Sequence, residues 1–479
     1  EGDSGSGKSR LLIEAVKLAR TRGQLVLRGQ GVNHVGQHPF AMFDGIVDGL
    51  LATHKEAPDT FGKMQQELGE HCEVLVAALP RLAPLFQTTA AARGAPEAFG
   101  ENRTIEALSR FLEAIGSEQR PAVIVLDDCQ WADALVFRLL RRWLSTSPEN
   151  SRSTTLIVSF RSEEVDAKHL LRKLTPSQHI VLQPLSDAET QQLLESMAGS
   201  LPQQALETVL RVSDGSPFMA SAVLRGLVES KALISGISGW QVAAEELSDL
   251  QSSQHAAGIL ARRIELLSED TLATLSLGAI LGKEFSLDVI GMLCPGGIAA
   301  AMPALQQARE RHLIWARADG GHFVFVHDQI RSALLQRLPQ TERQNLHGQA
   351  AQYYASEQPD RVSAIAYHYD QAAEPELALH YALRAAEQAR VQFSLDVAEQ
   401  QYRIARRGES SASQAVRFQI ANGLGETLML RGHYTEADPL FEEAADLAQG
   451  KLARAKVQSK QAELCFKRGD MEQATQGFE

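Results

Sequence analysis

The chain has 479 residues, which is too long for one ordinary hydrophobic core and suggests about three or four domains. Hydrophobic residues make up 44% of the chain and charged residues 22%, a composition typical of proteins that fold throughout. The formal net charge of -12 opposes broad attraction to nucleic-acid phosphates or anionic lipid, so we expect no nucleic-acid partner for this chain. No apolar run approaches the roughly 20 residues of a membrane helix. The four cysteines lack metal-site or CxxC spacing, which favours a reducing cytoplasm.

The first residues of the chain match the phosphate-loop pattern G-x4-G-K-S. The matching residues are Gly2, Asp3, Ser4, Gly5, Ser6, Gly7, Lys8 and Ser9, and Arg10 follows them. The glycines let backbone N–H groups surround phosphates, Lys8 reaches the β and γ oxygens, and Ser9 can coordinate magnesium. Apolar residues from Ser9 to Ala19 recur at helical spacing, as the motif requires. Because a buried strand normally launches this loop, we expect the launching strand to precede Glu1 and the chain to be an excerpt.

A second motif is an apolar strand, Val123–Leu126, that ends in Asp127 and Asp128. Paired carboxylates at a buried strand end can hold hydrated magnesium and orient a water molecule towards the γ-phosphate. We assign Asp127 to the magnesium and Asp128 to activation of the water. An ordinary Asp-Asp turn is the alternative, and the phosphate loop makes it the weaker one.

Short apolar runs separated by helical segments predict a parallel α/β sheet in a core of residues 1–190. The runs are Leu25–Leu27, Val123–Leu126, Thr155–Phe160 and Ile180–Leu182. Arg161 directly follows the third run, where it either senses the γ-phosphate or caps the strand at the surface; both interpretations are open. Gln130, Trp131 and Asp133 follow the acidic pair at a place where they can shape the site, although packing is the stronger interpretation for Trp131.

A long insertion, residues 38–120, separates the first and second apolar runs. It contains predicted helices at Phe40–Leu51 and Asn102–Ile115 and a predicted loop at Gln87–Pro96. Further along, Ser186 and Glu189 form a capping-box pattern, which predicts that a helix starts there. We expect a helical lid over residues 191–257.

The remaining sequence predicts two further domains. Residues 258–340 combine helices with a strand pair, His312–Ala316 and His322–Val326, which indicates a winged helix. Residues 341–479 are Ala-rich and helical, and Gly432–Ala437 is echoed 37 residues later by Gly469–Ala474. Leu424-Gly425 precedes the first copy at tetratricopeptide spacing, so we predict helical repeats of that kind.

Taken together, these motifs resemble the STAND class of signalling P-loop ATPases, whose ATPase module occurs in large bacterial regulators, kinases and cyclases. The resemblance covers nearly the whole chain. It rests on stretches in the same order as in that class: Gly2–Arg10, Val123–Asp133, Ser159–Arg161, Gly215–Phe218 and Phe325–Arg331.

The resemblance implies roles that the residues alone do not give. Pro217 would pack near the adenine, His327 would reach the ADP phosphate, and Arg161 would be the sensor at the strand end. Val326 stands where the better-known class pattern carries Met. ADP would hold the lid and winged helix closed, and exchange for ATP would permit self-association. The terminal repeats resemble sensor arrays that bind a protein or small-molecule inducer.

The leading interpretation is a cytoplasmic signal-transduction switch that binds ATP with Mg²⁺, hydrolyses it slowly and couples a repeat sensor to an output domain outside this chain. One alternative is the regulatory segment of a serine/threonine or histidine protein kinase. The sequence contains no kinase glycine loop, His-Arg-Asp or Asp-Phe-Gly element, so kinase chemistry would reside in flanking domains. Another alternative is a transcriptional activator, whose DNA-binding domain would also lie outside this chain.

Overall fold

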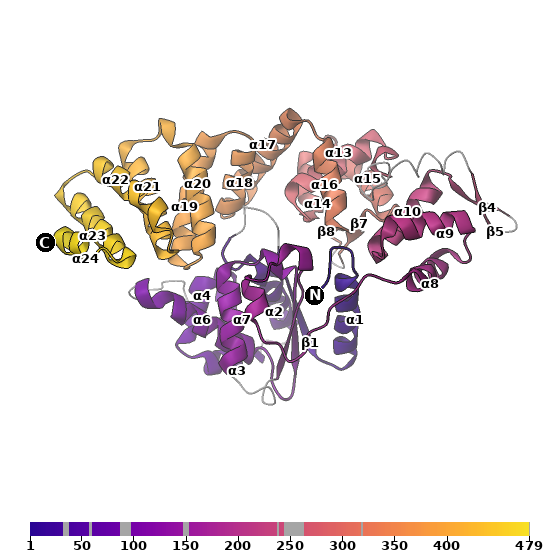
Figure 1. Cartoon of the computed structure of the whole chain (residues 1–479), viewed down its shortest axis with the longest axis horizontal. Coiled ribbons are helices and arrows are strands. Elements are labelled where there is room, and N and C mark those ends of the chain that lie inside the picture. The colour runs from indigo at the N-terminus through magenta and orange to yellow at the C-terminus, as the bar shows by residue number, and fades with distance from the viewer. Residues whose placement is uncertain are drawn as a thin grey trace. The chain divides into compact units, whose positions relative to one another are not determined.

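The computed structural model comprises two compact units, each described by itself (Figure 1). The first contains Glu1–Leu18, Ser159–Ala167 and Pro176–Leu346, and the second contains Ala19–Val158, Lys168–Thr175 and His347–Glu479. The structure describes residues 1–31, 38–56, 60–86, 97–146, 153–236, 239–243, 263–317 and 320–478. The predicted four-domain division stays a prediction.

A three-stranded parallel sheet forms the centre of the α/β part of the second unit. Its strands are β1 (Leu25–Gln30), β2 (Ala122–Asp127) and β3 (Thr154–Val158), in the order β1-β2-β3. All six residues of β2 are buried, as expected for a central strand with both faces covered. The predicted parallel α/β sheet is therefore confirmed. The fourth apolar run belongs to the first unit and forms no strand there: Leu182 makes an isolated bridge to Gly2, and the Ile180 carbonyl accepts from the Glu1 amino group over 2.9 Å.

Helices connect these strands. The insertion between β1 and β2 contains α2 (Asp44–Glu56), α3 (Thr60–Leu68), α4 (His71–Ala78), α5 (Ala83–Phe86) and α6 (Glu97–Ala114), and α7 (Ala134–Thr146) connects β2 to β3. The two helices predicted in the insertion correspond to α2 and α6. The predicted loop at Gln87–Pro96 lies outside the described residues.

The first unit begins with the predicted phosphate loop and the start of α1 (Lys8–Thr21). It continues through α8 (Asp187–Ala198), α9 (Gln203–Ser213) and α10 (Pro217–Glu229). The predicted capping box is present at α8, where the Ser186 N–H donates to Glu189 Oε2 over 2.8 Å. A hairpin of β4 (Leu233–Gly236) and β5 (Gly239–Val242) follows α10, where we expected helix.

A second group of elements in this unit combines helices with a small antiparallel sheet. The helices are α13 (Glu269–Leu281), α14 (Leu287–Leu293), α15 (Gly297–Glu310) and α16 (Asp328–Arg337). The sheet has the order β6 (Glu284–Ser286), β8 (His322–Phe325), β7 (Ile314–Ala316). The predicted strand pair is confirmed as β7 and β8, whereas β6 was not predicted. One hydrophobic core joins these elements to α8–α10, which ties them into one unit.

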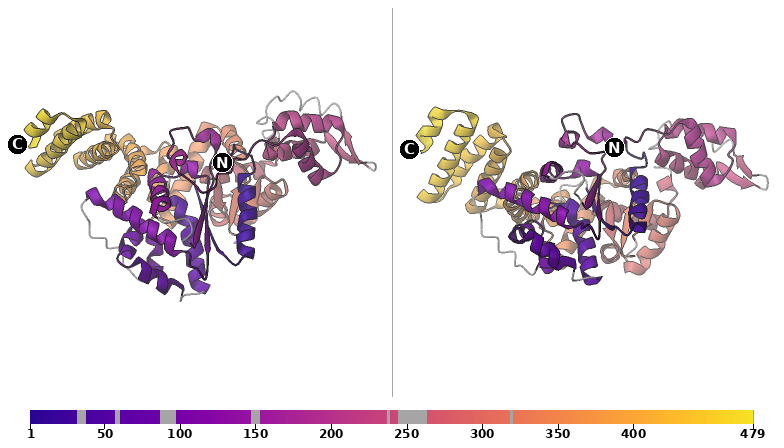
Figure 2. Two further views of the ribbon diagram at one scale, coloured as in Figure 1. Left: turned by 60° about the horizontal axis from the view of Figure 1, so that its bottom comes forward. Right: turned by 90° about the horizontal axis from the view of Figure 1, so that it is seen from below.

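Eight helices make up the C-terminal region of the described chain, and the figures show them as antiparallel neighbours (Figures 1 and 2). They are α17 (Gln340–Glu357), α18 (Val362–Gln371), α19 (Pro375–Val391), α20 (Leu395–Arg407), α21 (Gln414–Leu430), α22 (Tyr434–Leu447), α23 (Lys451–Arg468) and α24 (Met471–Phe478). The expected helical repeats are thus present. Gly425 permits close packing, since an added Cβ would lie 3.0 Å from the Phe441 ring.

The two predicted copies of the repeat motif occupy equivalent turns. Gly432 and Gly469 have φ values of 83° and 92°, in the left-handed region that favours glycine, and each lies two residues before the start of a helix. Ala437 and Ala474 are both buried inside those helices. The structure adds a third copy at the turn before α20, where Phe393 takes the glycine position with φ 61°. The sequence motif does not indicate this copy, because the motif contains glycine at that position.

Replacing Gly432 by alanine tests the importance of this turn. The added Cβ meets no atom within 4 Å, so the cost comes from the backbone alone, and we expect the free energy of unfolding to fall by about 1 kcal/mol. Urea denaturation measures the change. The matched control is Gly62→Ala inside α3, where an added Cβ also meets nothing and alanine favours helix. Equal effects of the two substitutions would contradict the prediction.

Candidate functional site

The phosphate loop has the backbone conformation that its glycines predict. Gly5 and Gly7 have φ values of 84° and 98°, and in the described part of the chain neither backbone N–H has a protein acceptor. Lys8 folds back over the loop, and its Nζ donates to the carbonyl oxygens of Gly2 and Asp3 over 2.6 and 2.7 Å. The loop therefore presents backbone donors and a fixed ammonium group within a few residues of one another.

Helix α10 approaches the loop at Gly5. The Phe218 N–H donates to the Gly5 carbonyl over 3.3 Å, and Ser216 Oγ does so over 3.4 Å. A Cβ on Gly5 would lie 2.8 Å from Ser216 Oγ, so this position needs glycine for space as well as for its positive φ. Pro217 is the first residue of α10, with Ser216 as the N-cap. The Gly215–Phe218 element therefore contacts the phosphate loop.

The segment after β3 pairs with the start of the loop. Gly2 forms parallel bridges to both Arg161 and Leu182. The Arg161 guanidinium donates to Asp328 and, over 3.0 Å, to Glu164. Arg161 is therefore held at the loop by two carboxylates.

His327 joins α16 to the phosphate loop. Its ring stacks on Phe218 with centroids 3.9 Å apart and an interplanar angle of 14°. His327 Nδ1 accepts from the Gln329 N–H over 3.2 Å, so a neutral ring carries its proton on Nε2. Nε2 lies 3.2 Å from Ser4 Oγ and can donate to it. His327 therefore contacts the loop through a hydroxyl.

The environment of His327 favours the neutral imidazole. Burial lowers the pKa of His327 to about 4, and the cations of Arg161, Lys283 and Lys8 add to the effect, whereas Asp328 opposes it. At neutral pH the ring is therefore an uncharged hydrogen-bond donor.

The second unit contains the acidic pair at the end of β2. Asp127 and Asp128 are 7% and 4% exposed. Asp128 adopts left-handed backbone angles, φ 55° and ψ 43°, which turn the chain sharply where the strand ends. Its two carboxylate oxygens each lie 3.3 Å from an amide nitrogen, that of Gln30 and that of Gln130. Two amides therefore fix the orientation of this carboxylate.

Sequence reasoning missed Gln30. It ends β1 and pairs in register with Asp127 across the parallel ladder, so the adjacent strand delivers its side chain to the acidic pair. Asp133 has another function: its carboxylate accepts from the N–H groups of Phe40 and Val136 over 3.0 and 2.9 Å. Burial raises the pKa of Asp133, and these two bonds oppose the rise. Asp133 thus fixes the start of α7 and the turn before α2.

Of the other predicted residues, Asp3 and Ser6 lie in the loop, and the buried Ser6 hydroxyl has no hydrogen-bond partner among the described residues. Ser9 lies in the first turn of α1. Arg10 forms an exposed ion pair with Glu14 over 3.0 Å.

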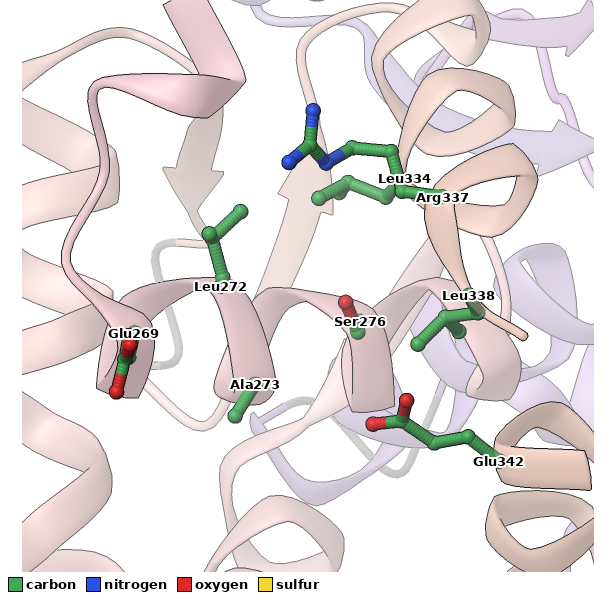
Figure 3. Close-up of a pocket in the computed structure, with 8 residues that line it drawn as sticks. All are labelled: Glu269, Leu272, Ala273, Ser276, Leu334, Arg337, Leu338 and Glu342. Atoms are coloured by element: carbon green, nitrogen blue, oxygen red, sulfur yellow. The ribbon is translucent and has the colours of Figure 1, made fainter.

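A cavity of about 240 Å³ lies elsewhere in the first unit, among α13, α16 and the start of α17 (Figure 3). Leu272, Leu334 and Leu338 line it together with the charged Glu269, Arg337 and Glu342. None of the predicted nucleotide-binding residues contributes to this cavity.

The donor groups of the loop fit phosphate. They are backbone N–H groups, a lysine ammonium and serine hydroxyls, all chemically suited to phosphate oxygens. Among the described residues, no group of three or more His, Cys, Asp and Glu side chains could hold a metal ion. Magnesium usually binds proteins through one or two carboxylates together with substrate phosphates and water. No helix in the described ranges is long and apolar enough to cross a membrane.

Residues 1–158 match the family pattern of the AAA ATPase domain. With the parallel sheet and the phosphate loop, this match shows that the chain carries an AAA-type P-loop ATPase module, as its sequence predicts. No curated protein matches the chain.

Several solved structures are similar to the chain. One is a signal transduction ATPase with numerous domains (STAND) with a tetratricopeptide repeat sensor, from Pyrococcus horikoshii, with 13% identity and a TM-score of 0.47, covering 99% of this chain and 69% of that one. Another is Cdc6p from Pyrobaculum aerophilum, with 11% identity, a TM-score of 0.30 and coverage of 70% and 85%. A third is a RuvB variant from Thermotoga maritima, with 16% identity, a TM-score of 0.23 and coverage of 69% and 94%. All three scores lie below 0.5, so we infer no function from them.

The low pKa of His327 predicts a pH-dependent stability. Between pH 7.5 and 5 the unfolded chain protonates this histidine near its ordinary pKa of 6.5, whereas the folded ring, with a pKa of about 4, stays neutral. Stability is therefore lost as the pH falls through this window, by about 2 kcal/mol from this residue. Urea denaturation of the parent and of His327→Gln at both pH values measures it. The parent should lose more stability than the variant, and parallel losses would contradict the assignment.

Proposed function

We propose that the chain is an ATP-binding signal-transduction switch with slow ATP hydrolysis, which couples a helical-repeat sensor to an output domain outside this chain. The observation that carries the proposal is the set of contacts on the phosphate loop. Gly5 contacts α10, Ser4 contacts His327 at the start of α16, and Gly2 pairs with Arg161. A phosphate bound at the loop would therefore act on elements far along the chain.

The proposed assignments within the site follow the chemistry of each group. The backbone from Gly2 to Gly7 and the Lys8 ammonium would bind phosphates, and Ser9 with Asp127 would hold Mg²⁺, which bridges phosphate oxygens and offsets their charge. Asp128 would orient and deprotonate the attacking water. Arg161 would sense the γ-phosphate once released from its carboxylates. Arg10, Pro217 and His327 complete the proposed nucleotide site.

The proposal includes a response to a partner. A protein or small-molecule inducer would bind the helical repeats, and exchange of ADP for ATP would permit self-association in the cytoplasm. Such a switch requires two states that differ in nucleotide affinity, because a ligand shifts an equilibrium only by its differential affinity. The Lys8 contacts are suited to this role, since the carbonyl oxygens of Gly2 and Asp3 accept from the same ammonium that phosphate would bind.

Lys8→Ala tests nucleotide binding. The substitution removes the ammonium that would pair with the β- and γ-phosphates and leaves only backbone donors, so we expect ATP binding to become undetectable by calorimetry. Lys17→Ala, on the exposed part of α1, is the matched control and should bind like the parent. Unchanged affinity in Lys8→Ala would refute the assignment of the loop.

Asp128→Asn separates binding from hydrolysis. The amide has almost the same shape as the carboxylate but cannot accept the proton of the water, so phosphate release should fall about 100-fold or more while ATP affinity is kept. If the switch model holds, the variant should favour the associated state in ATP, as measured by light scattering. Hydrolysis at the parental rate would remove Asp128 from this role.

A further inference from the structure

Glu163 places a negative charge directly on the phosphate loop. The Ser4 N–H donates to Glu163 Oε1 over 2.9 Å. The side chain is exposed, yet it reaches a backbone donor of the loop from the segment that follows β3. Neither the motif pattern nor the resemblance drew attention to this residue.

The backbone around Glu163 is fixed against the loop. It lies in a short 3-10 helix, Ser162–Glu164, and the Ser162 N–H donates to the Gly2 carbonyl over 3.3 Å. Val165, which follows this helix, is only 3% exposed and anchors it. The Glu163 carboxylate is therefore held beside the loop by the chain on both sides of it.

A carboxylate on a loop N–H group has the charge and acceptor chemistry of a phosphate oxygen. Ser4 lies two residues from Gly2, which pairs with Arg161, the proposed γ-phosphate sensor. Glu163 follows Arg161 by two residues and reaches the same part of the loop. Glu163 thus lies on the side where ATP would have a further phosphoryl group that ADP lacks.

We propose that Glu163 is a specificity-determining residue that lowers the affinity for ATP relative to ADP. Its carboxylate repels the γ-phosphate and competes with it for the Ser4 N–H, whereas ADP leaves this contact in place. This inference rests on the proposed function, because it assumes that the loop binds a nucleoside phosphate. It gives the switch a built-in preference for ADP that an inducer must overcome.

Glu163→Gln tests the inference, because glutamine keeps the length and an acceptor oxygen but removes the charge. Calorimetry with Mg²⁺ measures the Kd of ADP and of a non-hydrolysable ATP analogue for the parent and the variant. We expect the ratio of the analogue Kd to the ADP Kd to fall about five- to tenfold in the variant. The matched control is Asp166→Asn, which removes one exposed charge from the same segment and should leave the ratio unchanged.

Salt provides a second measurement. Repulsion between exposed charges is screened, so the difference between the parent and Glu163→Gln should shrink at about 1 M salt. The inference is overturned if the substitution leaves both affinities unchanged, strengthens them equally, or has the same effect as Asp166→Asn. If the parent binds ADP and ATP but the ratio does not move, only this inference fails. If the parent binds neither ADP nor the ATP analogue, the proposed function is wrong, and this inference is wrong as well.

Discussion

The close approach at Gly5 is the constraint on which the first unit depends. The Gly5 carbonyl accepts from both Ser216 Oγ and the Phe218 N–H, and any side chain at Gly5 would collide with that turn. Phe218 then supplies the surface on which His327 stacks. One backbone contact therefore places α10 and α16 against the loop, and a change in the loop conformation would alter both helices.

Burial and nearby cations keep the His327 ring neutral in this arrangement. His327 lies among Arg161, Lys283 and Lys8, where a second proton on the ring would be strongly disfavoured. A neutral Nε2–H can still donate to Ser4 Oγ, so the contact does not depend on protonation at neutral pH. A histidine suits this position because it is a donor that adds no charge beside three cations.

The sequence predicted the elements whose signals are local. The glycine spacing of the phosphate loop, the carboxylates after β2 and the Ser186–Glu189 capping box each lie within a few residues, and the structure contains these elements. Elements that depend on tertiary partners were missed. Strand β6 has three residues and exists because β8 pairs with it, and Phe393 holds a glycine conformation that no residue-type pattern indicates.

The same distinction explains which residues the sequence could propose for the site. Lys8 and Asp127 belong to motifs that residue type and spacing identify in the sequence. Gln30 and Glu163 are recognised only from their contacts in the folded chain, with Asp128 and with the Ser4 N–H respectively. Gln30 is recognisable once the β1–β2 register is known, because it lies opposite Asp127. No spacing rule would have selected Glu163.

The cationic side chains around the loop already have acceptors within the protein. The cations that phosphate would need are already engaged: Lys8 by loop carbonyls, and Arg161 by Asp328 and Glu164. A bound phosphate must exchange these contacts for its own, so part of its binding free energy is spent on releasing them. The contacts that would break involve residues of α16 and of the segment after β3. In the proposed switch, replacing these internal ligands by phosphate would give a direct physical route from nucleotide binding to movement of those elements.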